Sequence, residues 1–369
     1  MPRVLPNPME NAYLMAGMQL GILLRLVARH GVSLQPKYLG RLLFLLQGGM
    51  WSSMLTAYET ARRGRAIARA TAPTDPVFIV NHWRTGSTFL HQCLRADPRF
   101  TVPTLLQCCY PRSFMVARRF AEPLMRALLP ERRPMDNVKL GPGEPQEDED
   151  ALFRMTGYSP LERLIFPRNS NYFLRESLEA LPEDLKARQK WERAFVSFVK
   201  KLHVHNGGRL VLKNPFNALR IRTLAALFPD AVFIHTYRDP RLVIPSTVHM
   251  WSIVGQQNAL RKEWAPPPFE QVVDVFDRVL TTIRADLEAL PPHRRLEIRF
   301  EDLEQRPYDI VRGVYDHLGM PLEGQADERL RAFLGSVSGY RKNKYTLPDE
   351  QRKLIETRLQ HHMVRDGYV

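Results

Sequence analysis

The chain has 369 residues, with 53 basic and 39 acidic side chains, a formal net charge of +14 and only 3 cysteines. This length suffices for one large domain with a sizeable core, and so few cysteines exclude a disulfide framework and predict a reducing, cytoplasmic location. The positive charge favours an anionic ligand. The sequence contains no helix-turn-helix, zinc or RNA-binding motif, so we do not expect a nucleic-acid partner.

Residues 1–70 have the composition of helices, with apolar stretches at 14–27 and 42–55. Arg25 interrupts the first stretch, and it is too short to span a bilayer. The prolines of the first ten residues do not fit a signal peptide. We expect a helical N-terminal extension that packs on the core. The alternative is an amphipathic pair of helices that lies on a membrane surface or lines a lipid acceptor channel.

The segment 76–90 predicts a buried strand, a tight loop and the first turn of a helix. Residues 77–80 are apolar and partly β-branched, as in a parallel central strand. Gly86 permits a tight turn, and Ser87 and Thr88 begin an amphipathic helix. The unpaired first amides of that helix and its dipole attract an oxyanion, and Arg84 adds a full positive charge. An ordinary strand-loop-helix corner is the alternative.

This loop differs from a nucleotide-binding P-loop. That motif requires a glycine, four residues, and then Gly-Lys-Ser/Thr. Here Asn81 stands five residues before Gly86, and Ser87 takes the place of the lysine. Because the loop is still close to this motif, a P-loop nucleotide kinase is an alternative function. The missing lysine and the missing magnesium-binding hydroxyl argue against it.

Further strands and helices alternate along the rest of the chain. Residues 100–145 predict helices and loops at the sheet edge. The predicted helices then span 182–202, 220–228 and 269–290, and the strands end near Lys213, Tyr237 and Phe300. This order predicts a mainly parallel sheet with right-handed crossovers. Ligands of such sheets bind at the carboxyl ends of the strands, so Arg84, Lys213 and Arg238 should converge there.

The motifs together resemble those of sulfotransferases, enzymes that use 3′-phosphoadenosine 5′-phosphosulfate (PAPS), and the bacterial branch fits best. The family commonly places a cation two residues before the glycine of its 5′-phosphosulfate loop, as Arg84 stands before Gly86. It also carries a strand that ends in Arg-Asp/Asn-Pro, with a serine eight residues after the arginine, as in Arg238 and Ser246. In the family these two side chains hold the 3′-phosphate.

The resemblance implies a P-loop-NTPase-like α/β fold, with a mainly parallel central sheet flanked by helices. We expect residues 1–70 to form the extension and residues 71–369 the sulfotransferase domain. It also implies PAPS as the cofactor, no metal, and a small-molecule hydroxyl acceptor. Trp251, Trp264 and Phe269 favour an apolar or lipid-like acceptor, although buried aromatic residues normally belong to the core. The expected cofactor-binding residues are Arg84, Thr85, Gly86, Ser87, Thr88, Arg238, Ser246 and Lys344. Lys344 lies in a basic turn that resembles the family's last loop, and a solvated turn is the alternative there.

The catalytic residues are the least defined by the resemblance. Lys213 matches the lysine that reaches the leaving-group oxygen in the family, and Arg84 is expected to contact the 5′-phosphosulfate. Pro215 and Asn217 occupy the positions where branches of the family carry a histidine base. A carboxylate is then the next candidate, with Glu147 first and Glu144 second, although acids after a proline also favour a helix N-terminus.

Three histidines and one further arginine are weaker candidates for the site. His82, inside the anion loop, is a further candidate for the base or for a sulfate ligand, and Arg241 is expected to add positive charge near Arg238. The adjacent His361 and His362 are interpreted as surface residues. A basic membrane- or nucleic-acid-binding protein on the same scaffold is the remaining alternative, and the oligomeric state is not indicated.

Overall fold

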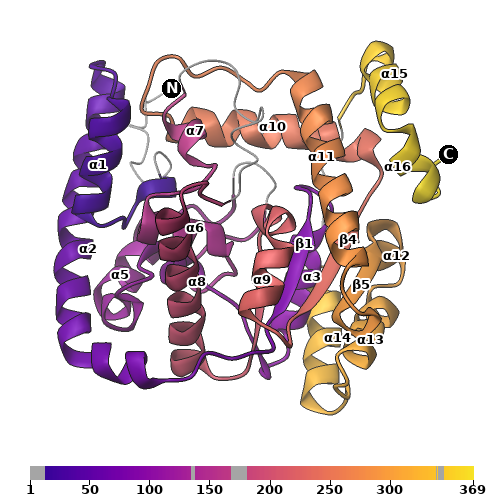
Figure 1. The fold of residues 1–369 in the computed structure, drawn as a ribbon, viewed down its shortest axis with the longest axis horizontal. Coiled ribbons are helices and arrows are strands. Elements are labelled where there is room, and N and C mark those ends of the chain that lie inside the picture. The colour runs from indigo at the N-terminus through magenta and orange to yellow at the C-terminus, as the bar shows by residue number, and fades with distance from the viewer. Residues whose placement is uncertain (1–12, 134–137, 168–180, 338, 340–344) are drawn as a thin grey trace. The chain divides into compact units, whose positions relative to one another are not determined.

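The computed structural model describes residues 13–133, 138–167, 181–337, 339 and 345–369 (Figure 1). Their strands form one five-stranded parallel sheet in the order β2-β3-β1-β4-β5. The strands are β1 (Val77–Asn81), β2 (Phe100–Thr101), β3 (Arg209–Lys213), β4 (Val232–Tyr237) and β5 (Arg295–Arg299). The predicted parallel α/β fold is confirmed, and β2, only two residues long, is the strand that the sequence pattern did not predict.

The central strand is buried on both faces. Every residue of β1 is buried, which explains its continuous apolar composition. Val77 and Ile79 share one hydrophobic cluster with residues of α3 (Ser87–Arg95), α13 (Pro307–His317) and α14 (Gln325–Val337). Phe78 faces the other side, where its ring stacks on Phe233 and meets Phe228 after α9 (Ile221–Leu227). Helices therefore cover both faces of the sheet.

The chain folds into two compact units. One comprises the described parts of Met1–Thr71, Pro103–His205 and His249–Pro267, and the other has Ala72–Val102, Asn206–Val248 and Pro268–Val369. The segment that ends at Thr71 is thus grouped with two later segments of the chain. The whole sheet lies in the second unit.

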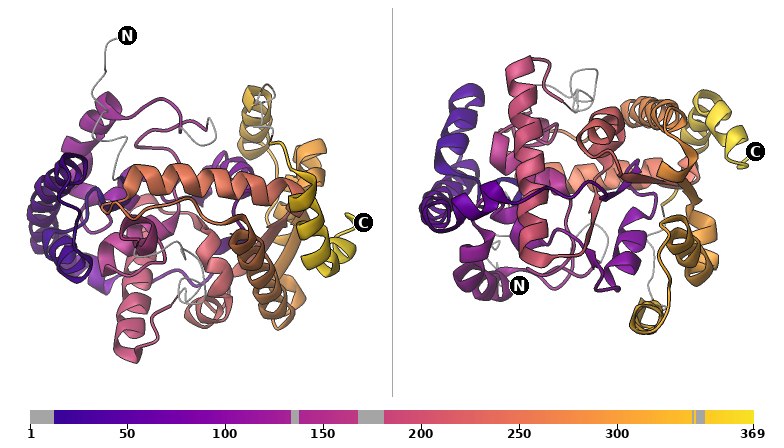
Figure 2. Two further views of the ribbon diagram at one scale, coloured as in Figure 1. Left: turned by 90° about the horizontal axis from the view of Figure 1, so that it is seen from above. Right: turned by 60° about the horizontal axis from the view of Figure 1, so that its bottom comes forward.

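The first unit is helical. In it α1 and α2 lie side by side (Figures 1 and 2). Its helices are α1 (Leu20–His30), α2 (Pro36–Arg69), α4 (Leu105–Cys109), α5 (Phe114–Leu128), α6 (Asp148–Thr156), α7 (Glu162–Ile165) and α8 (Leu185–Asn206), after the short 3₁₀ turn η2 (Tyr13–Met15). None of the described helices is long and apolar enough to cross a membrane.

The second unit completes its α/β layers after β4. Helix α10 (Pro240–Asn258) starts at the turn that follows β4 and continues into the first unit. The remaining elements are η3 (Pro215–Leu219), α11 (Phe269–Glu288), η4 (Pro292–Arg294), α12 (Phe300–Gln305), α15 (Asp349–Arg358) and α16 (Gln360–Arg365). A second cluster joins Val243 and Ile244 of α10 to Phe276 of α11 and to Ile355 and Met363.

Candidate functional site

The loop between β1 and α3 has an unusual backbone. Gly86, the residue before α3, has φ = 83°, a left-handed conformation that glycine adopts at little cost. A Cβ atom at this position would lie 1.9 Å from Cδ2 of Phe300, so the approach of that ring also requires glycine. Arg84 has φ = 69° and is the only non-glycine residue with positive φ among those described. Such conformations are concentrated at functional sites.

Thr85 ties this loop to the neighbouring strand. Its buried hydroxyl donates to the carbonyl of His82 (2.9 Å) and lies 3.0 Å from Oγ1 of Thr236 on β4. These bonds fix the loop between two parallel strands. The Thr85 side chain is thereby occupied by protein partners, so its predicted part in cofactor binding would use the backbone.

Arg84 and Ser246, 162 residues apart, are in direct contact. Nε of Arg84 donates to Oγ of Ser246 at 2.8 Å. Ser246 is buried on α10, two turns after that helix leaves the Arg-Asp-Pro turn. The structure therefore brings together residues from the two predicted phosphate-binding motifs.

Arg238 also contacts this loop, and one of its guanidinium nitrogens has no hydrogen-bond acceptor among the described residues. Its guanidinium carbon is 4.5 Å from the centre of the Phe300 ring, and Nη1 donates to the carbonyl of Arg84 at 3.3 Å. Nε is buried and has no hydrogen-bond partner among the described residues. Burial lowers the pKa of Arg238, and the charge of Arg84 adds to this effect. A buried guanidinium nitrogen without an acceptor is a position where an anion would bind favourably.

Lys213 ends β3, next to the same loop. Ile79 of β1 pairs with Lys213, and the following residues of β1 lead into the anion loop. Lys213 is buried. Burial lowers the pKa of His91 on α3 to about 3, and the positive charge of Lys213 contributes to the lowering. The ends of β3, β1 and β4 are thus adjacent and carry Lys213, Arg84 and Arg238, as predicted from the order of the elements.

The residues after Lys213 have structural partners. The side chain of Asn214 caps η3 by accepting from the amide of Phe216 at 2.9 Å. Oδ1 of Asn217 accepts from Nη1 of Arg220 at 3.3 Å. The position that carries a histidine in a branch of the resembled family therefore holds an amide engaged in the turn.

Glu147 and Glu144 lie in the first unit. Glu147 is the residue before α6 and is half-buried, and its side chain makes no capping hydrogen bond. Oε1 of Glu144 is 3.5 Å from Nζ of Lys139. The next acids form the first turn of α6, where the helix dipole favours them. Among these, burial raises the pKa of Asp150 to about 6.

His82 lies in the protein interior. Its ring contacts those of Phe276 and Trp83, and Nδ1 is 3.0 Å from the carbonyl of Trp83. Nε2 is buried and has no partner among the described residues. Burial lowers the pKa of His82 to about 4, so the ring is neutral at pH 7. This environment favours a packing role over the proposed role in proton transfer or sulfate binding.

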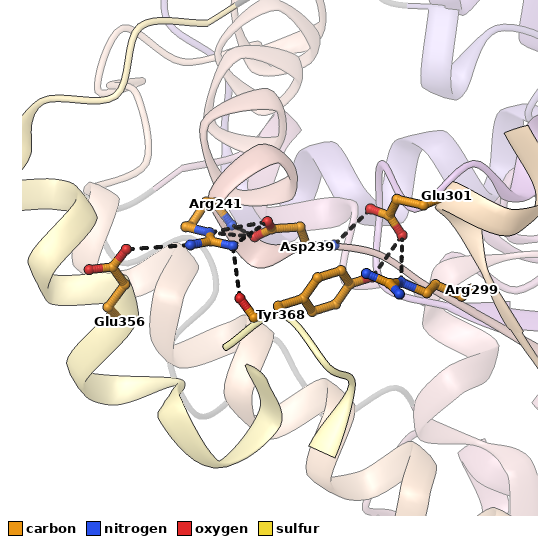
Figure 3. Close-up of polar contacts among 6 residues, drawn as sticks. All are labelled: Asp239, Arg241, Arg299, Glu301, Glu356 and Tyr368. Atoms are coloured by element: carbon orange, nitrogen blue, oxygen red, sulfur yellow. Dashed lines mark hydrogen bonds and ion pairs between the residues drawn. The ribbon is translucent and has the colours of Figure 1, made fainter. Parts of the chain in front are cut away.

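Arg241 is held by acidic groups and by a backbone carbonyl (Figure 3). Nε and Nη2 make a two-pronged contact with the Asp239 carboxylate at 3.0 and 2.8 Å. Nη1 is 3.6 Å from Glu356, and Nη2 also donates to the carbonyl of Tyr368 at 3.1 Å. Its charge is thus largely balanced by carboxylates within the protein.

Tyr368 connects this turn to the start of α12. Its hydroxyl donates to Oε2 of Glu301 at 2.8 Å, and the guanidinium of Arg299 lies 4.6 Å from its ring centre (Figure 3). Oε1 of Glu301 accepts from the amide of Asp239 at 3.4 Å. Sequence reasoning missed this support of the turn next to Arg238, because its members are far apart in the chain.

The interpretation of His362 as a surface residue is wrong. His362 is buried, with Nδ1 bonded to Arg284 and Nε2 to Oδ1 of Asp277 at 2.9 Å. Asp277, His361 and His362 could each offer one ligand atom to a metal ion. Because Arg284 donates to Nδ1, the proton of the neutral ring lies on Nε2, which leaves no lone pair for a metal. His361 is exposed, as expected.

The remaining predicted residues are placed as follows. Ser87 is buried and Thr88 is half-buried in the first turn of α3, whose first amides have no partner within the helix. Lys344 lies outside the described residues.

Comparisons with known proteins identify relatives of this chain. A family described as the Sulfotransferase family matches residues 76–324. The omega-hydroxy-beta-dihydromenaquinone-9 sulfotransferases Stf3 of Mycobacterium bovis and Mycobacterium tuberculosis are each 33% identical over 321 residues, which cover 86% of this chain and 82% of the relative.

Two solved structures resemble the fold. Sulfotransferase STF9 from Mycobacterium avium has a TM-score of 0.69 at 16% identity and covers 94% of this chain and 95% of its own. Sulfotransferase STF1 from Mycobacterium tuberculosis H37Rv has a TM-score of 0.58 at 17% identity, with coverage of 95% and 93%. At these identities the structural matches establish the fold.

Proposed function

The chain belongs to the sulfotransferase family, and we propose that it transfers a sulfuryl group from PAPS to a hydroxyl of a lipid-like acceptor. The observation that best supports PAPS as the donor is the convergence of Arg84, Ser246 and Arg238. A donor with phosphate groups at both ends needs two anion sites within one nucleotide length. The direct Arg84–Ser246 contact and the buried Nε of Arg238 fit that need.

The elements that carry these residues support a separate position for each phosphate end of the donor. The amides of Gly86, Ser87 and Thr88 at the start of α3 would bind the 5′-phosphosulfate, with Arg84 beside them. Arg238 and Ser246 would bind the 3′-phosphate. Lys344, in the predicted last loop, is proposed to add to this site. None of these contacts needs a metal ion.

Charge stabilisation would be the main catalytic effect. Bound PAPS supplies the sulfuryl group and a bisphosphate leaving group. Negative charge increases on the leaving oxygen as the bond breaks, so a cation fixed there stabilises the transition state more than the ground state. We assign this role to Lys213, which ends β3 beside the loop. Arg84 would hold the charge spread over the transferred group.

The acceptor hydroxyl also requires a base. We propose Glu147, with Glu144 as the second candidate, because Pro215 and Asn217 offer no imidazole after Lys213. His82 is less favoured because burial lowers its pKa to about 4, which makes the ring a weak base, and because the ring is packed against aromatic side chains. A positioned base of this kind contributes about 10²- to 10⁴-fold to the rate.

The acceptor class is proposed from the curated relatives. The name of the Stf3 proteins gives an omega-hydroxylated dihydromenaquinone as their acceptor. We propose a hydroxylated, largely apolar molecule for this chain as well. A cytoplasmic location with peripheral membrane contact through the N-terminal helices fits such an acceptor.

A transfer assay tests this function. The purified protein would be incubated with ³⁵S-labelled PAPS, a bacterial lipid extract and a chelator of divalent ions, and labelled products would be identified by mass analysis. We expect a product heavier by one sulfuryl group, together with adenosine 3′,5′-bisphosphate. A parallel reaction with ³²P-labelled ATP and magnesium tests the kinase alternative. Transfer of phosphate without transfer of sulfate would refute the proposal.

A further inference from the structure

Helix α2 exposes a row of large apolar side chains along one side, with the exposed polar Gln47 among them. Six of its large apolar side chains are between 37% and 67% exposed: Leu39, Leu43, Met50, Trp51, Met54 and Tyr58. At 3.6 residues per turn these positions fall on one side of the helix, and they extend along about 28 Å of its axis. Scattered exposed apolar residues are normal on a protein surface, but a stripe of this length indicates an interaction site.

The opposite side of α2 holds the helix in place. Leu45, Gly49 and Ser52 are buried there. A Cβ atom at Gly49 would be only 3.1 Å from the carbonyl of Met18, and Oγ of Ser52 donates to the carbonyl of Gly17 at 2.6 Å. The orientation of α2 is therefore fixed by its inner side, so its apolar outer side is a stable feature of the surface.

The charges around this surface are almost entirely positive. Glu59 is the only acidic residue between positions 13 and 74. Its side chain is buried and pairs with Lys201 of α8. The exposed charges of α2 are the cations Lys37, Arg62, Arg63, Arg65 and Arg69.

The neighbouring helix α5 has a similar exposed composition. It packs against α2 within the first unit, and Phe120 and Leu124 are exposed on it. Two of its arginines, Arg118 and Arg126, extend from the same helix and pair with Glu122. Apolar and basic groups are thus exposed together on two adjacent helices.

We propose that the outer side of α2 docks on the surface of an anionic lipid bilayer and lies in the plane of the interface. Apolar residues would enter the acyl boundary, Trp51 and Tyr58 would lie at headgroup level, and the arginines would contact lipid phosphates. A second copy of the chain is a poorer partner, because symmetric pairing would bring the same cations together. This proposal rests on the peripheral membrane contact proposed above and assigns it to one side of α2. The vesicle assay below contains neither donor nor acceptor, so its failure would be distinguishable from failure of sulfuryl transfer.

Vesicle co-sedimentation tests this surface. The wild-type protein and the double variant Met50→Glu/Met54→Glu would be mixed with vesicles of phosphatidylcholine plus phosphatidylglycerol, and with vesicles of phosphatidylcholine alone. The matched control is Leu185→Glu/Val204→Glu, which adds the same charge at exposed apolar positions of α8. A neutral double variant, Met50→Ser/Met54→Ser, separates loss of apolar contact from added charge.

We expect the wild-type protein and the control to bind the anionic vesicles, and the α2 glutamate variant to bind about tenfold more weakly or less. The serine variant should bind with intermediate strength, and high salt should weaken all binding. Circular dichroism and bisphosphate affinity check that the variants are folded. Equal binding by the glutamate variant and the wild type would overturn the proposal, as would no binding by the wild type. A dimer that only the α2 variants disrupt would also overturn it.

Discussion

Replacing Arg238 by alanine should weaken the binding of adenosine 3′,5′-bisphosphate more than it disturbs the fold. In the structure this guanidinium stacks on Phe300, donates once to the carbonyl of Arg84, and leaves its buried Nε without a described acceptor. The proposed 3′-phosphate supplies that acceptor. Loss of a partly buried charged partner costs about 2 to 3.5 kcal/mol, which corresponds to roughly 30- to 300-fold in affinity.

Isothermal titration of the bisphosphate with a chelator present measures this effect. Arg238→Lys keeps the charge but loses the planar pair of donors, so its affinity should be intermediate. The matched control is Arg306→Ala, which removes an exposed arginine that pairs with Asp302 at the end of α12. We expect this control to stay within about threefold of the wild type. Equal affinities for Arg238→Ala and the wild type would refute the assignment of the 3′-phosphate site.

Three further results are expected. Ser246→Ala should lower bisphosphate affinity about tenfold in the same titration, because the 3′-phosphate loses a hydroxyl donor and Nε of Arg84 loses its acceptor; unchanged affinity would exclude Ser246 from the 3′-phosphate site. Glu147→Gln should lower turnover at least about 100-fold with little change in bisphosphate affinity, and full turnover would show that Glu147 is not the base. Burial lowers the pKa of His82 from 6.5 to about 4, so the neutral ring contributes stability that is present above pH 6.5 and is lost as the pH falls through 4. Urea titrations at several pH values measure the free energy of unfolding. Between pH 6.5 and 4, His82→Asn should reduce the pH-dependent change in this free energy by up to about 3 kcal/mol, and an unchanged pH dependence would contradict the buried, neutral state of His82.

Features encoded in local sequence were predicted well. The apolar run of β1, the glycine of the loop and the start of α3 are set by neighbouring residues, and the structure has all of them. The contact of Arg84 with Ser246 joins residues 162 positions apart. It was within reach of prediction because parallel strands bring their carboxyl ends to one edge of the sheet.

Features that depend on packing between distant segments were not predicted. β2 has two residues, too few for a periodic pattern. The burial of His362 results from Arg284 and Asp277 on α11, about 80 residues earlier in the chain. Tyr368 supports the Arg238 turn through Glu301 for the same kind of reason. Neither pairing leaves a signal in the sequence near the residue concerned.

The central claim is that Arg84 and Arg238, which follow β1 and β4, bind the two phosphates of one nucleotide. A crystal structure with adenosine 3′,5′-bisphosphate is its most direct test. The account predicts the 3′-phosphate on Arg238 and Ser246, and the 5′-phosphate on the first amides of α3 beside Arg84. A nucleotide bound away from the ends of β1 and β4, or one that touches only a single one of the two arginines, would contradict it.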